Sequence, residues 1–420
     1  MAVVSMHTSP TAALGRSANG GLNVYVREVC SALDRLGVAT DVFCRAPDPD
    51  AIPAPESLAA YSRVIYLPAG RAGLDKYELL DQVPAFVSAV REHIAGSGLA
   101  YDLIYSHYWL SGLVACALRG RLGLPWAHTA HTLAVVKNRQ LAPGDRPEPE
   151  IRVDLEGEIA RCADLLVVST EAEGDHLRAA YHVRPDRIAV VSPACDLAAL
   201  GPGTSRAEAR RRLGAAGHPQ FLFVGRLERL KGVDVALHAL ALLNRADAEL
   251  TVIGDDSAVG GESERLRLQH LAEDLGLGAR VRFLGSVPQP TLADHYAAAD
   301  ALIVPSYSES FGLVALEAQA CGTPVVASCA DGLASIVADG VTGFLVAGHA
   351  PADYAARMER LAADPELVRG MGRRARRRAA GFTWDRTANR LLEHFSTLPG
   401  TRASRASGRL QVGVQAASAD

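Results

Sequence analysis

The chain has 420 residues, of which 49% are hydrophobic and 21% are charged, and 43 basic against 47 acidic residues give a net charge of −4. This composition excludes a disordered chain, and it excludes a nucleic-acid binder that depends on bulk positive charge. The first basic residue is Arg16 and no apolar run is long enough for a bilayer, so we expect no secretory signal and no membrane span. Seven scattered cysteines without a CxxC pair are typical of a reducing compartment, and we expect a cytoplasmic protein.

Short apolar runs alternate with helical patterns along the chain, in two successive series. Strands that alternate with helices predict βαβ units, so the fold class is α/β with two Rossmann-like halves. Residues rich in Gly and Pro near position 200 predict a linker, which places the domains at 1–198 and 199–382. In chain order, we expect strands at 2–6, 40–44, 63–67, 102–107, 125–129, 164–169, 187–191, 221–225, 249–254, 281–285, 301–305 and 324–328, and helices at 23–36, 79–95, 109–121, 233–244, 263–275, 292–299, 311–321, 351–363, 365–380 and 384–395.

Two segments near the C-terminus lie outside this alternation. The arginine run at residues 373–378 falls on a predicted helix, and we interpret it as a solvated helix face. Residues 400–420 are rich in Ser, Gly, Ala and Arg and predict a disordered tail. Neither segment indicates a function.

Polar side chains recur at the ends of predicted strands in the first half. His7 follows the first strand, Tyr108 follows the 102–107 strand, and His131 and Thr132 follow the 125–129 strand. Since the carboxyl ends of parallel strands meet at one edge of a sheet, these side chains predict a shared crevice. Hydrogen-bonded structural histidines and helix capping are the alternatives. Cations nearby (Lys76, Lys137 and Arg152) and the Gly20-Gly21 turn matter only if the crevice binds an anion.

The second half has a more specific pattern. Arg226 follows the 221–225 strand and Lys231 precedes a helix, so two cations five residues apart lie between a strand end and a helix start. That spacing suits a diphosphate. Glu309 and Gly312 follow the 301–305 strand, and Glu317 falls on the next helix. Bare N–H groups at Gly312 suit a phosphate, whereas neutral capping explains one glutamate but not the whole arrangement.

With Arg226, Lys231 and the Glu309-x7-Glu317 pattern, the chain resembles the retaining GT-B glycosyltransferases of family 4, from Val3 to about Phe395. The resemblance implies two Rossmann-like domains that face a central cleft, a UDP-sugar co-substrate, and a C-terminal helix near 383–398 that crosses back to the first domain. It implies that Arg226 and Lys231 bind the donor diphosphate, that Glu309 contacts the sugar hydroxyls and that Glu317 binds the ribose. Gly21, Val287 and Gly312 would complete the donor site.

The first half resembles a narrower group, the D-inositol-3-phosphate glycosyltransferases that make the first mycothiol intermediate. The matching stretches are His7–Pro10, Gly20–Val26, Ser106–Gly112 and His128–Asn138. By this resemblance the acceptor phosphate is bound by Lys76, Tyr108, Thr132 and Arg152, with His7, Gly20 and Asn23 also in the acceptor site. His131 would lie beside the reacting carbon and act with Arg226, Lys231 and Glu309 in catalysis. A magnesium ion at Tyr296, Ala297, Ala299 and Thr323 and a homodimer are also implied.

Three positions depart from the group. Ala18 stands where it has an acidic residue, Asp331-Gly332-Leu333-Ala334 replaces Gly-Gly-Leu-Pro, and Pro193-Ala194 replaces Pro-Gly. We expect transfer of N-acetylglucosamine from UDP-GlcNAc to 1D-myo-inositol 3-phosphate, with small-molecule substrates only. Another family 4 transferase for a different cyclitol or sugar phosphate stays open, for example one like sucrose-phosphate synthase. A non-catalytic homologue or a nucleotide-sugar epimerase fits less well, because the donor residues and the acceptor phosphate set are complete.

Overall fold

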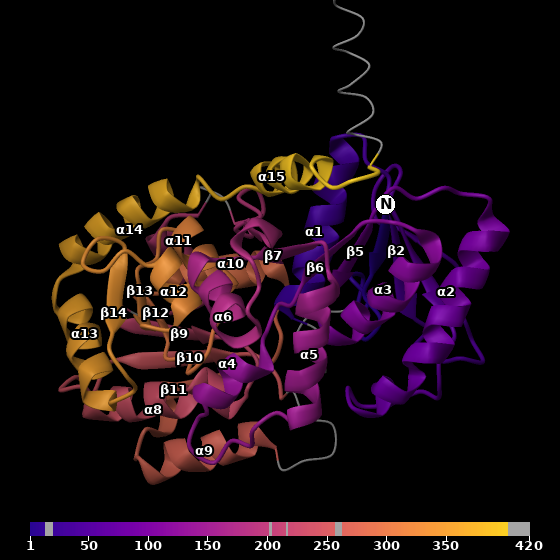
Figure 1. Ribbon diagram of the computed structural model, residues 1–420. Coiled ribbons are helices and arrows are strands. Elements are labelled where there is room, and N and C mark those ends of the chain that lie inside the picture. The colour runs from indigo at the N-terminus through magenta and orange to yellow at the C-terminus, as the bar shows by residue number, and fades with distance from the viewer. Residues whose placement is uncertain (13–19, 201–203, 216, 257–262, 402–420) are drawn as a thin grey trace, which may run out of the picture.

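The computed structural model describes residues 1–12, 20–200, 204–215, 217–256 and 263–401 (Figure 1). Ala18 and the predicted tail from residue 402 onward lie outside the described residues. The described part of the chain forms two sheets with helices on both faces, which confirms the α/β fold class. None of its helices has the length and apolar character needed to cross a membrane.

The first sheet has eight strands in the order β3-β4-β2-β1-β5-β6-β7-β8, and only the β3–β4 pair is antiparallel. β1 and β7 are short apolar runs of Ala, Val and Leu in which every residue is buried, as expected for a parallel sheet between helical layers. The strands are β1 (Ala2–Val4), β2 (Asp41–Arg45), β3 (Glu56–Ser57), β4 (Arg63–Leu67), β5 (Ile104–His107), β6 (Trp126–Thr129), β7 (Leu165–Val168) and β8 (Ile188–Val190).

Helices cover the first sheet on both faces. One face packs on α2, α3 and α5, and the other packs on α1 and the last helix, α15. The helix expected from residue 79 begins as a 3-10 turn, η1, and becomes α-helical at Val83 with Pro84 in its first turn. The helices are α1 (Gly21–Arg35), η1 (Glu78–Gln82), α2 (Val83–Ser97), α3 (Trp109–Leu122), α4 (Ala134–Arg139), α5 (Glu150–Cys162), α6 (Glu171–Tyr181), η2 (Pro185–Arg187) and α15 (Trp384–Ser396).

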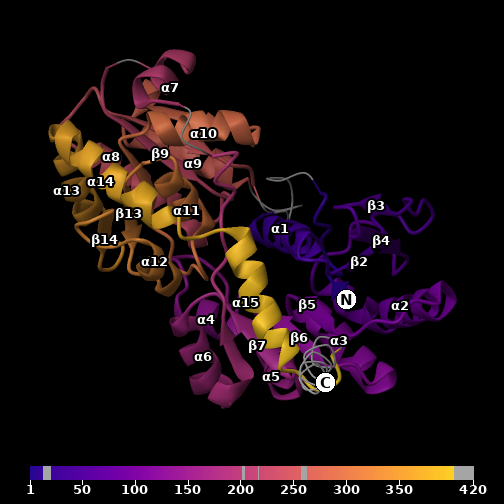
Figure 2. The same ribbon diagram turned by 90° about the horizontal axis from the view of Figure 1, so that it is seen from above.

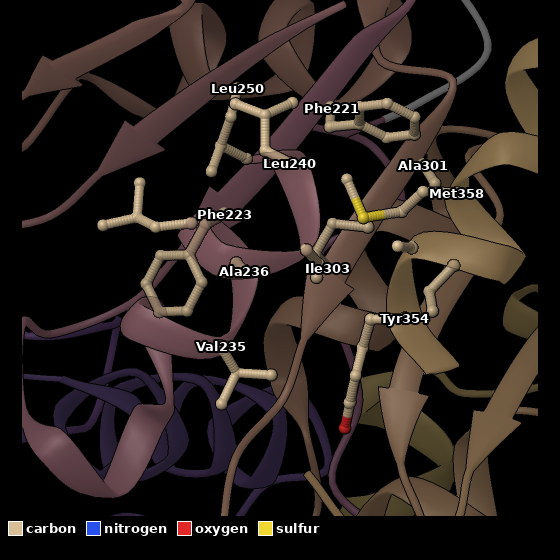
Figure 3. Packing of buried hydrophobic residues seen from close by; sticks show 14 of the residues in the cluster. Phe221, Phe223, Val235, Ala236, Leu240, Leu250, Ala301, Ile303, Tyr354 and Met358 are labelled. Atoms are coloured by element: carbon tan, nitrogen blue, oxygen red, sulfur yellow. The ribbon is translucent and has the colours of Figure 1, made fainter. Parts of the chain in front are cut away.

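The second sheet has six parallel strands in the order β11-β10-β9-β12-β13-β14. Phe221 and Phe223 of β9 pack against Leu240 of α8 and against Tyr354 and Met358 of α13, which forms the core on one face (Figure 3). The strands are β9 (Gln220–Val224), β10 (Glu249–Ile253), β11 (Val281–Leu284), β12 (Ala301–Val304), β13 (Val325–Ser328) and β14 (Gly343–Val346). The helices are α7 (Arg206–Arg212), η3 (Arg229–Lys231), α8 (Val233–Leu242), α9 (Glu264–Asp274), η4 (Gly278–Arg280), α10 (Gln289–Ala298), α11 (Leu313–Ala320), α12 (Asp331–Ile336), α13 (Pro351–Ala363) and α14 (Pro365–Ala379).

The chain returns to the first half at its end. α13 and α14 cover the second sheet, and α15 then runs across and lies along α1 (Figure 2). Trp384, Leu391 and Phe395 of α15 are buried in the same core as the α1 residues. The two halves are therefore joined twice, once near residue 200 and once before α15.

The arginine run on α14 is a solvated face only in part, because Arg374, Arg376 and Arg378 also donate to backbone carbonyls of neighbouring segments. Arg376 donates to the carbonyls of Ala320 (3.2 Å) and Cys321 (2.9 Å), at the C-terminal end of α11. Arg378 donates to Ile336 O (2.9 Å), at the end of α12. Carbonyls at a helix C-terminus have no partner within their own helix and carry partial negative charge, so these arginines stabilise two helix ends.

Candidate active site

A cleft of about 580 Å³ lies between the two halves, where the carboxyl ends of both sets of strands meet. Most of the predicted site residues line it, which brings together residues as far apart in the sequence as His7 and Glu317. From the first half these are His7, Gly20, Gly21, Lys76, Tyr108, His131, Thr132 and Arg152, and from the second half they are Arg226, Lys231, Val287, Glu309, Gly312 and Glu317. Asn23 and the four predicted magnesium ligands do not line it.

Asn23 has a supporting position rather than a place on the cleft wall. Its side chain is buried in the first turn of α1 and donates to Thr8 Oγ1 (2.6 Å) and to Ser9 O (2.5 Å). Its Oδ1 atom accepts the N–H of Gly20 (3.1 Å). Asn23 therefore ties the turn after β1 to the glycine pair that begins α1.

The basic residues of the second half are paired with carboxylates. Lys231, at the end of η3, forms an ion pair with Glu309 (Nζ–Oε2, 2.7 Å), and Arg226 forms one with Glu228 (2.7 Å). Lys231 and Glu309 are each about one-fifth exposed. Two cations therefore face the cleft in a partly dehydrated setting, where a diphosphate would gain more from them than in water.

The loop that carries Glu309 is shaped by close packing around Gly312. Gly312 precedes α11 with a φ of 94°, and a Cβ there would lie 2.7 Å from Leu333 Cδ2. Only glycine adopts that conformation in that space without strain. Gly332 donates its N–H to Glu309 O (3.0 Å), so the start of α12 fixes the same loop from behind.

Glu317 is held by a tyrosine. Tyr296, in α10, is fully buried and donates its hydroxyl to Glu317 Oε2 (2.8 Å). Burial raises the pKa of Glu317 to about 7, and the hydrogen bond from Tyr296 opposes that rise. Glu317 is therefore a carboxyl whose charge changes near neutral pH.

The predicted magnesium ligands lie together at the C-terminal end of α10. The hydroxyl of Thr323 donates to the carbonyl of Tyr296 (2.5 Å), which also accepts the N–H of Ala299 (3.2 Å). The Thr323 hydroxyl and the Tyr296 carbonyl are thus hydrogen-bonded to each other, and none of the four residues has a carboxylate. Across the residues that the structure describes, no group of three or more His, Cys, Asp or Glu is placed to hold a metal ion. These residues do not fit a magnesium site, and no step below uses a metal.

A row of buried aromatic and histidine rings forms the wall of the first half. His131 has left-handed backbone (φ 60°), and its Nε2 lies 3.1 Å from Nδ1 of His107, which is fully buried. Ser310 of the second half donates its hydroxyl to His131 O (2.5 Å), so this residue links the two halves. Burial lowers the pKa of His131 to about 3, which keeps its imidazole neutral.

The predicted acceptor residues form one connected group. Arg152, in the first turn of α5, is 1% exposed and donates to Thr132 Oγ1 (2.9 Å), and its guanidinium lies 5.0 Å from the centre of the Tyr108 ring. The ring of His7 lies 4.4 Å from that of Tyr108 on the same wall. A buried guanidinium with hydroxyls beside it is a typical binding arrangement for a phosphate.

Two contributors were missed from the sequence, Glu148 and the Tyr296 hydroxyl, whereas Lys137 was already named there as a cation near the crevice. Glu148 pairs with Lys76 and Arg152, and Lys137 joins them at the cleft. Glu148 lies in a Pro-Glu-Pro stretch far from any strand end, and nothing in that pattern marks it. The second is the side chain of Tyr296, which the resemblance implied only as a magnesium ligand and which instead holds Glu317.

A second link between the halves involves a position where the chain departs from the related group. Asp331, at the start of α12, is hydrogen-bonded to the imidazole of His176 in α6. Both side chains line the cleft. The aspartate thus adds a contact between the two halves that a glycine cannot make.

Comparison with known proteins agrees with this geometry. Residues 205–378 match the family described as glycosyl transferases group 1, and residues 20–194 match the glycosyl transferase 4-like domain. Sucrose-phosphate synthase from Thermosynechococcus elongatus superposes with a TM-score of 0.86, at 33% identity over 99% of both chains. HepE of Anabaena in complex with UDP-glucose superposes with a TM-score of 0.73, at 21% identity over 95% of this chain and all of that one. The fold is that of the GT-B glycosyltransferases, and the protein is a hexosyltransferase.

The curated relatives narrow the class. The D-inositol 3-phosphate glycosyltransferase of Corynebacterium jeikeium is 45% identical over 410 residues, which cover 95% of this chain and 97% of that one. The chain belongs to the family of these glycosyltransferases. The family resemblance inferred from the sequence motifs is therefore confirmed.

Proposed function

We propose that this enzyme transfers N-acetylglucosamine from UDP-N-acetylglucosamine to 1D-myo-inositol 3-phosphate, an early step of mycothiol biosynthesis. The observation that carries the proposal is one cleft with cations on both walls. Arg226 and Lys231 suit the diphosphate of a nucleotide sugar, and Lys76 and Arg152 suit a phosphate monoester. The name of the 45%-identical relative supports the acceptor, and the UDP-glucose bound to HepE supports the donor class.

In this proposal the nucleotide sugar lies against the second half. Arg226 and Lys231 bind its diphosphate, and Lys231 exchanges part of its contact with Glu309 for the phosphate oxygens. Glu309 then accepts hydrogen bonds from sugar hydroxyls, and Glu317 accepts from the ribose hydroxyls. Val287 and Gly21 enclose the donor from the two sides of the cleft.

The acceptor lies against the first half. Lys76, Tyr108, Thr132 and Arg152 bind its phosphate, and His7 and Gly20 border its ring. Each hydrogen bond to a charged group is worth about 1.5–3 kcal/mol, so loss of the acceptor phosphate would weaken binding by orders of magnitude. The acceptor hydroxyl is thereby held near the anomeric carbon, which accounts for a large part of the rate.

The transfer proceeds with retention by attack on the same face from which UDP departs. The acceptor oxygen bonds to the anomeric carbon as the bond to the diphosphate oxygen breaks, and that diphosphate oxygen takes the hydroxyl proton. Arg226 and Lys231 stabilise the negative charge that develops on the diphosphate. His131 is neutral and so orients the sugar without adding repulsion to an oxocarbenium-like centre. The links from Ser310 and Asp331 hold the halves together and exclude water.

The sucrose-phosphate synthase that is 33% identical over nearly the whole chain supports a second candidate function. In that case the acceptor is a sugar phosphate instead of a cyclitol phosphate. The phosphate site serves both, so the ring-contacting residues would decide between them.

The test is product analysis by mass spectrometry with a panel of donors and acceptors. UDP-GlcNAc and UDP-glucose are each paired with inositol 3-phosphate, free inositol and fructose 6-phosphate. We expect the product of UDP-GlcNAc and inositol 3-phosphate to dominate. Equal rates with free inositol would exclude the phosphate site, and sucrose phosphate as the main product would establish the second function.

A further inference from the structure

A buried carboxylate lies behind the cations of the acceptor wall. Glu148 accepts from Lys76 Nζ at both oxygens (2.9 and 2.8 Å), from Lys137 Nζ (2.5 Å) and from Arg152 Nη1 (3.0 Å). Its side chain is only 7% exposed. Three cations from three separate segments therefore meet at one carboxylate.

Glu148 is on the far side of these cations from the cleft. Lys76, Lys137 and Arg152 line the cleft, whereas Glu148 is not among the described residues that do so. It therefore acts on a ligand only through the cations. Lys76 contacts both oxygens of Glu148, and Lys137 and Arg152 contact one oxygen each, so every cation keeps at least one other N–H group for an anion in the cleft.

The backbone and the second carboxylate oxygen of Glu148 are also fixed. Asn138 donates to Glu148 O (3.0 Å) and accepts from Glu148 N (2.7 Å), so both backbone polar groups are held by one side chain. Tyr77 donates its hydroxyl to Glu148 Oε2. A carboxylate with this many partners has little freedom to move, and the cations bound to it share that rigidity.

The charges of the group are also matched to a phosphate. Burial alone would raise the pKa of Glu148, but Arg152 and Lys137 outweigh it and hold the pKa well below the usual range. Arg152 also pairs with Glu156 (2.7 Å). Three cations and two carboxylates leave one positive charge in excess, which attracts an anion without leaving three like charges unbalanced.

We propose that Glu148 is a positioning residue for the acceptor phosphate and that Lys137 is a third cation that binds that phosphate. Glu148 fixes the three cations at the spacing that the phosphate oxygens require. The inference rests on the proposed function, because it assigns these residues to the phosphate of the same acceptor.

The experiment compares Glu148→Gln with the parent enzyme, and Glu150→Gln serves as the matched control because Glu150 is exposed at the start of α5, two residues after Glu148. Steady-state rates are measured with inositol 3-phosphate and with free inositol, and KM for the donor is measured separately. We expect the preference for the phosphorylated acceptor to fall about tenfold or more in Glu148→Gln, through KM for that acceptor. The KM for the donor stays within about twofold, and Glu150→Gln matches the parent.

Lys137→Met carries the test if Glu148→Gln does not fold, since Lys137 is partly exposed at the cleft. It is expected to lower the same preference about tenfold. A folded Glu148→Gln, or a Lys137→Met variant, that keeps the parent's preference for phosphate overturns the inference. A parent enzyme with no preference for phosphate overturns the proposed function instead, so the two failures are distinct.

Discussion

The hydrogen bond from Tyr296 to Glu317 makes a prediction about pH and donor binding. Tyr296→Phe removes the hydroxyl that donates to Glu317 Oε2 at 2.8 Å and leaves the ring in its buried place. The carboxylate then loses a donor that favours its charged form. We expect the pKa of Glu317 to rise further, and the donor affinity that depends on the ionised carboxylate to fall.

The size of the effect follows from the contact. A hydrogen bond to a charged group is worth about 1.5–3 kcal/mol, and about 1.4 kcal/mol corresponds to one pKa unit. The pKa of Glu317 would therefore move from about 7 to about 8–9. At about pH 7.5 the ionised fraction falls from about three-quarters to between about a quarter and a few per cent. KM for the donor should then rise about 3- to 25-fold, and the difference should shrink above about pH 9.

The assay is KM for the UDP-sugar as a function of pH in the parent and in Tyr296→Phe. In the parent, KM should rise as the pH falls through about 7, because protonated Glu317 is a poorer acceptor for ribose hydroxyls. Tyr354→Phe is the control, since it removes another buried tyrosine hydroxyl of the same half, one that donates to Gly348 O. A uniform rise of KM at every pH in Tyr296→Phe would refute the reasoning, because it would mean that the hydroxyl acts through packing alone.

Three further predictions concern other parts of the chain. Lys231→Ala should lower kcat/KM by about 100- to 1,000-fold with an unchanged melting temperature, and near-normal transfer would remove Lys231 from the donor site. Burial raises the pKa of Glu173 to about 7 against 4.5 for a free carboxyl, so this group costs stability as pH rises through that interval. In urea unfolding, the free energy of unfolding of Glu173→Gln relative to the parent should therefore rise by up to about 3 kcal/mol as the pH rises from about 4.5 to about 8. A difference in unfolding free energy that does not change with pH would contradict the assignment. Arg376→Ala should lower the free energy of unfolding by about 1–2 kcal/mol, because it removes the hydrogen bonds to the carbonyls at the end of α11. Arg377→Ala, at an exposed position, should leave the free energy of unfolding unchanged.

The strand ends made much of the cleft predictable. His7, Tyr108 and His131 follow strands of one parallel sheet, and Arg226 and Glu309 follow strands of another. Because parallel strands end at the same edge, these residues had to converge within each half, and the structure places them all on the cleft. Their chemical type and their position after a strand were sufficient for this prediction.

Side chains that act through other side chains were not predictable in this way. Glu148 reaches Lys76, which lies 72 residues earlier, and Tyr296 reaches Glu317 from a different helix. Neither follows a strand, and both contacts depend on how helices and loops pack after the sheets have formed. Asn23 shows the reverse case, because the family resemblance implies a place in the acceptor site whereas its hydrogen bonds support the turn behind that site.

The pairing of charges across the cleft suggests how one site handles two anionic substrates. On the donor wall, Lys231 shares its Nζ with Glu309, a residue that itself lines the cleft, so an incoming diphosphate has to replace part of that contact. On the acceptor wall, the carboxylate partner of Lys76 lies behind the cleft, so a phosphate adds to the pair without replacing it. Under the proposed function, the donor wall is therefore the one that rearranges on binding, and this frees Glu309 for the sugar when the diphosphate is bound. The acceptor wall is built in advance, which suits a phosphate whose role is to position a hydroxyl.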